Sequence, residues 1–157
     1  DVFSRLLFGG RVSLLVGVVA VLISSVPGTA LGLIAGYYRG WVEGLIMRIM
    51  ALMLSFPGIL LALGIVALLG PGLLNVMIAV GIAGIPSYTR LVRSSVLAVQ
   101  KKLYVRAART IGCRDGRILL QHILPNVLAP VIVLSTLGVA GAILSAGTSQ
   151  TSFTPVA

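Results

Sequence analysis

Three long stretches without a charged side chain constrain this chain more than any other feature. They cover residues 12–38, 49–89 and 118–157, and the last stretch holds His122 as its one ionisable side chain. Only 10% of the residues are charged, whereas about a quarter are charged in a typical soluble domain. The sequence therefore predicts an all-α integral membrane protein.

The lengths of these stretches predict the number of spans. A bilayer core about 30 Å thick needs about 20 apolar helical residues, so residues 12–38 cross once. Residues 49–89 are too long for one crossing, and the Gly-Pro-Gly turn at residues 70–72 divides them into two helices. Residues 127–146 supply one more span. We therefore predict a polytopic transmembrane helix bundle with about four spans.

Residues 90–117 are strongly basic, and we refer to them as the basic segment. They hold eight of the twelve lysine and arginine side chains and a single acid. Short loops rich in lysine and arginine stay on the cytoplasmic side of a membrane, so we predict a cytoplasmic basic segment. The Gly-Pro-Gly turn and residues 1–11 would then lie outside, and the segment at residues 39–48 would lie inside.

The first span carries a ridge of small side chains. The ridge comprises Ala20, Ser24, Gly28, Gly32 and Gly36. Residues four apart lie on the same side of a helix, so another helix can approach this ridge closely. Pro27 is expected to kink the helix here. The ridge is typical of tight bundle packing, and a mobile hinge or a pathway wall is the alternative.

The side chains that catalysis or ion coupling needs are missing from the spans. Proton relays, voltage sensors and many ion-coupled carriers place a charged group at membrane depth, and these spans have none. The chain has no GxxxxGKS phosphate loop, and its three acids and one histidine form no catalytic set or metal site. We therefore predict no enzyme and no cofactor or metal in this chain.

The basic segment has the pattern of a short amphipathic helix at about residues 101–112. Its apolar positions are Leu103, Tyr104, Ala107, Ala108 and Ile111, and its basic positions are Lys102, Arg106 and Arg109. The two sets fall on different helical faces. Such a helix docks on a protein surface or lies flat on anionic lipid, and the pattern alone leaves both open.

The residues after this helix carry signals for its end. We expect Gly112 to end the helix and Asp115 to cap a second helix that begins near residue 116. Pro125 and Pro130 are expected to break or kink the chain before the last span.

Two motifs, one inside the basic segment and one after it, have a familiar spacing. Residues 104–112 read YVRAARTIG, nine residues follow, and residues 122–126 read HILPN. This arrangement resembles the EAA loop of ABC importer permeases, whose pattern is EAA, three residues, G, nine residues and IxLP. Residues 1–11 and the GYYRGW run at residues 36–41 are similar to the second, C-type permease subunit of dipeptide, oligopeptide and nickel importers.

The resemblance implies that residues 101–125 couple the membrane spans to a separate cytoplasmic ATPase. The residues that it assigns to this contact are Tyr104, Arg106, Ala107, Ala108, Gly112, Leu124 and Pro125. This sequence departs from the family at Arg106, where the motif has Glu, so the charge is reversed. His122 replaces the Ile of the general pattern and is interpreted as a structural residue near the membrane surface.

The resemblance also implies a role for the whole subunit. It would be a permease in the plasma (inner) membrane of a prokaryote that moves peptides or a similar small solute by alternating access. Its expected partners are a second permease subunit, ATPase subunits that bind ATP and Mg²⁺, an extracytoplasmic solute-binding protein and membrane lipid, but no nucleic acid. The alternatives are a non-transporting remnant or membrane scaffold that keeps the docking loop, and an ion-coupled carrier.

The resemblance divides the chain into two parts. Residues 1–146 are expected to form a partial ABC importer transmembrane domain, which lacks a span at each end relative to the family. Residues 147–157 are too polar for a span and diverge from the family, which suggests a truncation or a shifted reading frame.

Overall fold

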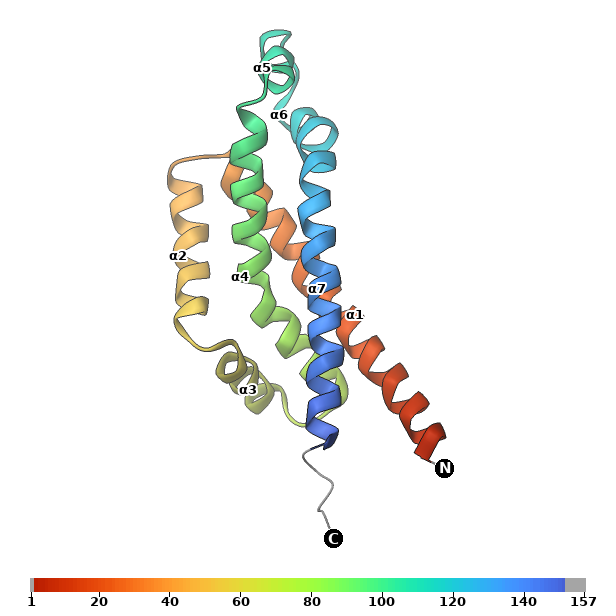
Figure 1. The fold of residues 1–157 in the computed structure, drawn as a ribbon. Helices are drawn as coiled ribbons and strands as arrows, with labels where there is room; N and C mark the ends of the chain where they lie inside the picture. The colour runs from red at the N-terminus through yellow and green to blue at the C-terminus, as the bar shows by residue number, and fades with distance from the viewer. Residues whose placement is uncertain (1, 152–157) are drawn as a thin grey trace.

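The computed structural model describes residues 2–151, which fold almost entirely into helices (Figure 1). In chain order the elements are α1 (Val2–Tyr37), α2 (Trp41–Ser55), α3 (Gly58–Leu69), α4 (Leu73–Gln100), α5 (Leu103–Thr110), α6 (Asp115–Arg117), the π-helical segment η1 (Ile118–Ile123) and α7 (Leu124–Thr151). These residues include no strand, so the predicted all-α fold is confirmed. The predicted polar tail continues α7 to residue 151, and residues 152–157 lie outside the described residues.

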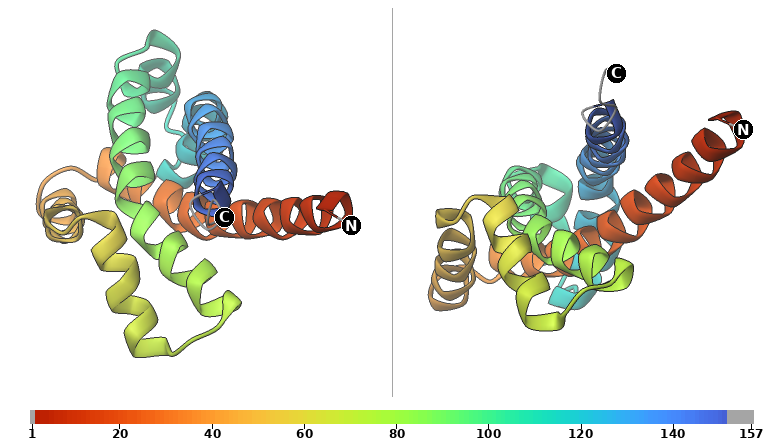
Figure 2. Two further views of the ribbon diagram at one scale, coloured as in Figure 1. Left: turned by 60° about the horizontal axis from the view of Figure 1, so that its bottom comes forward. Right: turned by 90° about the horizontal axis from the view of Figure 1, so that it is seen from below.

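Three long helices, α1, α4 and α7, form the centre of the bundle (Figure 1). The N-terminal half of α1 extends away from the other helices in both views of Figure 2. α2 and α3 lie on the side of α4 that is away from α7, and α5 and α6 sit at the end of the bundle where α4 ends. The core therefore lies where the C-terminal half of α1 meets α4 and α7.

Three helical runs are long and apolar enough to cross a membrane, namely α1, α4 and the run Asp115–Gly141. α2 and α3 meet at a bend of 92°, and they make a fourth span if the pair is counted as one. This count agrees with the predicted bundle of about four spans. The bend was not predicted, although Phe56 is extended (ψ 138°), as a residue before a proline prefers.

The Gly-Pro-Gly turn divides α3 from α4, as predicted. Gly70 and Gly72 have φ angles of 92° and 151°, a region that glycine enters without strain. The Asn75 side-chain nitrogen donates hydrogen bonds to the carbonyl oxygens of Leu69 and Gly70, both at 3.1 Å. These bonds tie the turn to the first residues of α4.

The helices extend farther into the charged segments than predicted. α1 begins well before residue 12 and continues through Pro27. α2 takes up most of residues 39–48, which separate two of the uncharged stretches, and α4 continues past Arg93 into the middle of the basic segment. Arginine is a good helix former and its long side chain reaches water from a helix surface, so charge alone does not end these helices.

The ridge of small residues on α1 packs against α4, and all five of its residues are buried. The facing pairs are Gly28 with Tyr88, Gly32 with Val92, and Gly36 with Val96. A Cβ atom added at these glycines would lie only 2.5 to 2.7 Å from the Cβ atom of the partner. Because the pairs repeat every four residues on both helices, the two backbones stay close over about two turns.

α4 contributes small residues of its own to this interface. A Cβ atom added at Gly81 would lie 2.5 Å from Ile23 Cγ2, and one added at Gly84 would lie 2.5 Å from Ser24 Oγ. The Ser24 hydroxyl is 2.8 Å from the carbonyl oxygens of both Ala20 and Gly81. The buried hydroxyl is therefore satisfied inside an otherwise apolar contact.

Candidate functional site

The short helix predicted in the basic segment is α5, at the end of the bundle where α4 ends (Figure 1). Gly112 has a φ of 87°, and the backbone N–H of Cys113 donates to the carbonyl oxygen of Ala108 at 3.2 Å. This geometry satisfies one of the last carbonyls of the helix, so Gly112 ends α5 as predicted.

α5 turns one side to the bundle and leaves another exposed. Val105 is fully buried and Ala108 is 6% exposed. The exposed apolar residues, which we call the outer face of α5, are Leu103, Tyr104, Ala107 and Ile111. Within this face, Leu103 and Ile111 are 84% and 81% exposed. The predicted apolar face is thus divided, because Ala108 packs inward.

Sequence reasoning missed Val105, which is the central inward residue of α5. Val105 and Ala108 are three residues apart and therefore lie on the same side of the helix. They belong to a hydrophobic cluster whose other members are Tyr37, Tyr88, Val92, Val96, Val99, Ile118, Ile123, Val127 and Val131. Because these residues come from α1, α4, η1 and α7, the cluster fixes α5 to all of the long helices.

A hydrogen bond joins the end of α1 to α6. The Tyr37 hydroxyl donates to Asp115 Oδ1 at 2.5 Å, and the Arg109 guanidinium lies 5.2 Å from the centre of the Tyr37 ring. Our prediction that Asp115 caps a helix was wrong, since Arg114 is the N-cap and Asp115 is the first residue of α6. A carboxylate that accepts a hydrogen bond from a hydroxyl group makes a strong, charge-assisted bond. This bond holds the Asp115 side chain away from the backbone N–H groups that a capping side chain would accept from.

A second polar contact ties the start of α2 to α4. The Arg93 Nε donates to Glu43 Oε1 at 2.7 Å, and the Arg93 Nη2 contacts the same oxygen. The pair is partly buried, with 32% of the Arg93 side chain and 18% of the Glu43 side chain exposed. The two acids that the structure describes are therefore both engaged within the fold.

The chain is wound more loosely just before the proline of the second motif. The π-helical segment η1 ends at Ile123, and Leu124 and Pro125 begin α7. A proline has no N–H to offer to the carbonyl of Gln121, and π-type winding accommodates such a gap. We predicted that Pro125 and Pro130 break or kink the chain; neither breaks it, because one helical run continues from Asp115 to Gly141, and the π-helical segment is the local distortion before Pro125.

The predicted contact residues near η1 differ in their exposure. Leu124 is half-buried and Pro125 is exposed. His122 is half-buried, and its Nδ1 atom is buried without a hydrogen-bond partner among the described residues. The part of the chain that the structure describes contains no group of His, Cys, Asp or Glu side chains that could hold a metal ion.

The basic residues of α5 lie on a side of the helix that is separate from the outer face, and we call this side the basic flank. Arg106 and Arg109 are three residues apart and line a pocket together with Arg39 and Lys101. Arg106 is therefore not part of the outer face of α5. The other cations that line this pocket come from the turn after α1, from the residue after α4 and from α5 itself.

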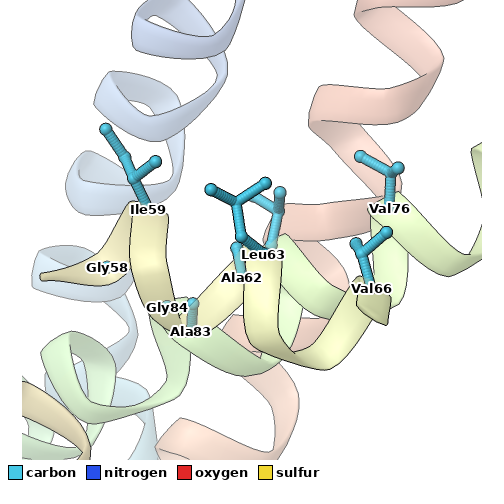
Figure 3. Close-up of a pocket in the computed structure, with 9 residues that line it drawn as sticks. Gly58, Ile59, Ala62, Leu63, Val66, Val76, Ala83 and Gly84 are labelled. Atoms are coloured by element: carbon cyan, nitrogen blue, oxygen red, sulfur yellow. The ribbon is translucent and has the colours of Figure 1, made fainter. Parts of the chain in front are cut away.

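An apolar groove lies between α3 and α4 (Figure 3). Its volume is about 590 Å³, and its lining residues are Gly58, Ile59, Ala62, Leu63, Val66, Val76, Val80, Ala83 and Gly84. These residues offer no charged or hydrogen-bonding side chain to a solute. The groove therefore has the chemistry of a surface that faces another helix or lipid.

Comparisons with known proteins place these elements in a family. The family model for the binding-protein-dependent transport system inner membrane component matches residues 28–154, which include most of the small-residue ridge and all of α5. The dipeptide transport system permease protein DppC of Alkalihalophilus pseudofirmus is 51% identical over 146 residues, which is 93% of this chain and 48% of the relative. The glutathione transport system permease proteins GsiD of Pectobacterium atrosepticum and Escherichia coli are 44% and 48% identical with the same coverage.

The chain spans about half the length of these curated relatives. Its family match nevertheless covers four fifths of its own residues and runs through the bundle and the basic segment. The helical bundle, the ordered α5 and the spacing of the two motifs agree with that match. The chain thus belongs to the family of binding-protein-dependent transport system inner membrane components.

Proposed function

We propose that this chain is part of a permease subunit of an ATP-driven importer that moves peptides or a similar small solute by alternating access. The proposal is supported by the family match and by relatives that are named dipeptide and glutathione permeases. In this proposal the chain lies in the inner membrane of a prokaryote, with residues 90–117 in the cytoplasm. A second permease subunit and an extracytoplasmic solute-binding protein complete the path of the solute.

The outer face of α5 is the observation that carries the proposed contact with an ATPase. Leu103 and Ile111 are among the most exposed large apolar side chains of the described chain, although they lie beside basic residues outside the spans. Covering one such side chain on a partner contributes about 1.5–3 kcal/mol. A cleft on the ATPase that accepts a short helix would cover both leucine and isoleucine side chains at once. Ala107 lies between them, and its small side chain would let the helix approach the floor of the cleft closely.

The anchoring of α5 supports a mechanical role for this contact. Val105 and Ala108 hold the helix against the hydrophobic cluster, and the Tyr37–Asp115 hydrogen bond links α6 to α1. A displacement imposed on α5 by the ATPase would therefore reach α1, α4 and α7 together. ATP and Mg²⁺ would bind to the ATPase, and this chain would supply binding and motion without catalysis.

Site-directed crosslinking tests the docking surface. In a Cys113→Ser background, Ala107→Cys and Ile111→Cys place a thiol on the outer face, and Ala108→Cys places one on the buried side as the matched control. We expect both outer positions to crosslink to the ATPase in the assembled complex and position 108 to crosslink much less. An absence of crosslinks from both outer positions, in a complex that retains ATP-dependent uptake, would contradict the proposal.

The substrate class needs a separate measurement. The permease pair, the ATPase subunits and the binding protein would be reconstituted, and ATP hydrolysis would be measured with dipeptides, longer peptides or glutathione. We expect one of these solutes to stimulate hydrolysis in the presence of the binding protein. Stimulation by none of them, in a complex whose ATPase is active, would remove peptides from the proposed substrates.

A further inference from the structure

A pocket with an unusual concentration of positive charge lies beside α5. It is lined by Arg39, Leu97, Gln100, Lys101, Arg106 and Arg109 and has a volume of about 350 Å³. The lining comes from the turn after α1, the end of α4 and the basic flank of α5. Among the residues that the structure describes, no acidic side chain contributes to it.

The positive charge of this pocket is only partly balanced by the described chain. Glu43 is paired with Arg93, and Asp115 accepts the hydrogen bond of Tyr37, whose ring Arg109 faces. Arg109 therefore has a carboxylate nearby, whereas no ion pair is found for Arg39, Lys101 or Arg106 among the described residues. Four cations around one pocket repel one another, and an anion between them would relieve this repulsion. The pocket therefore has the electrostatics of an anion-binding site.

Gln100 adds a neutral donor to the same lining. Its Nε2 atom is buried and has no hydrogen-bond acceptor among the described residues. That atom is out of reach of a water-sized group as it stands, so a ligand oxygen would accept from it only after the side chain turns. The three arginines each present several N–H donors, and they therefore favour an anion with several oxygen atoms.

The position of the pocket along α4 indicates where that anion comes from. α4 has 28 residues, and about 20 are enough to cross the hydrocarbon core of a bilayer. The last turns of α4, beyond Arg93, then lie in or next to the headgroup layer. Leu97 lines the same pocket and gives it an apolar wall, which a fully solvated phosphate would not need.

We propose that this pocket binds the phosphate group of an anionic phospholipid headgroup. Arginine side chains bind phosphate oxygens through paired N–H donors, and the Lys101 ammonium group adds a compact positive charge. One headgroup would then join the end of α1, the end of α4 and α5. This inference requires only that the chain lies in a bilayer, so it stands or falls independently of the proposed contact with an ATPase.

Lipid retention by matched variants tests the proposal. The assembled complex would be placed in nanodiscs of phosphatidylcholine with a minor fraction of phosphatidylglycerol, and retained lipids would be counted by native mass spectrometry. Arg39→Gln/Lys101→Gln removes two charges from the pocket but leaves α5 unchanged. Lys102→Gln/Arg114→Gln removes two charges from neighbouring positions that do not line it.

We expect the pocket variant to lose affinity for phosphatidylglycerol by about 25-fold, since it lacks two side chains that would donate charge-assisted hydrogen bonds to the phosphate. The control variant keeps every donor that lines the pocket and lacks only exposed charges outside it, which salt screens, so its affinity should fall by less than about threefold. Phosphatidylcholine binding should not change in either variant. Equal losses in the two variants, or none in the pocket variant, would overturn the proposal.

Two further outcomes would assign the pocket to another ligand. If inorganic phosphate at low millimolar concentration displaces phosphatidylglycerol, the ligand of the pocket is free phosphate and not a lipid. A pocket variant that keeps its phosphatidylglycerol but loses its ATPase subunits on purification would place the pocket in the interface with the ATPase. Either result would overturn the lipid proposal.

Discussion

The contact between α1 and α4 and the outer face of α5 are both free of charged side chains, but one is buried and the other is exposed. Along α1 and α4, glycines bring two backbones so close that an added Cβ atom would overlap the partner helix. On α5, apolar side chains of ordinary size project from the fold with nothing in the described chain to cover them. The first surface is completed inside the chain, whereas the second is the one that we propose a partner covers. The two surfaces differ in side-chain size and in exposure, and the outer face differs from the exposed apolar side chains of the spans by its place among basic residues.

The largest effect should come from filling the α1–α4 contact. In Gly32→Leu the new Cβ atom would lie 2.6 Å from Val92 Cβ and 2.8 Å from the Thr89 carbonyl oxygen, which belongs to the α4 backbone and cannot easily move. We expect a loss of about 3 kcal/mol in the free energy of unfolding and poor accumulation in the membrane. Gly10→Leu is the control, because an added Cβ there meets nothing within 4 Å. Thermal unfolding in detergent measures both, and similar melting temperatures would contradict this account of the interface.

The next effect should come from the buried side of α5. Val105→Ala removes two methyl groups from a fully buried position, which costs about 2 kcal/mol. We expect faster amide hydrogen exchange throughout α5, because the helix loses its central contact with the cluster. Leu103→Ala, on the exposed side, removes a larger side chain without opening the core and serves as the comparison. Unchanged exchange in Val105→Ala would indicate that the cluster does not hold α5.

A smaller effect is expected at the Tyr37–Asp115 hydrogen bond. Tyr37→Phe removes the hydroxyl donor but keeps the ring that Arg109 faces, and we expect a loss of about 1 kcal/mol. Tyr38→Phe is the matched control, because no hydrogen bond of its hydroxyl is found among the described residues. Chemical denaturation measures the free energy of unfolding of the two variants. If they are equally stable, the hydrogen bond contributes nothing to the attachment of α6.

The smallest effect on stability should come from the outer face. Leu103 is already 84% exposed, so Leu103→Ala should change the free energy of unfolding by less than about 0.5 kcal/mol. The same change should weaken association with the ATPase by about tenfold, as loss of a central contact residue does. Leu68→Ala on α3, which is 89% exposed, is the control and should leave that association unchanged. A weaker complex in both variants would contradict a specific role for the outer face.

Local signals predicted much of this fold. The Gly-Pro-Gly turn ends α3, Gly112 ends α5, and the small-residue ridge faces a helix, because each depends on a few neighbouring residues. The bend at Phe56 had a local signal too, the proline that follows it, but a long apolar stretch concealed it. The sequence therefore carried more information on helix ends than composition alone suggested.

The site was less predictable, because its contacts join distant segments. The Tyr37 hydroxyl reaches Asp115 across 78 positions of the chain, and no spacing rule relates the two. Arg39 shares a pocket with α5 for the same reason. The inward turn of Ala108 depends on which side of α5 meets the cluster, and the helical pattern alone does not fix that rotation.

The continuity of α4 has a consequence for how far motion can travel. Its 28 residues form one helix with Pro86 near the middle, with α3 beside one end and α5 attached at the other. Pro86 has no N–H to offer to the preceding turn, and Figure 1 shows α4 bent part-way along. The close contacts with α1 lie on both sides of this proline, at Gly81 and Gly84 before it and at Val92 and Val96 after it. A small push at α5 would thus reach the apolar groove through a change in this bend or through a joint movement of α1 and α4.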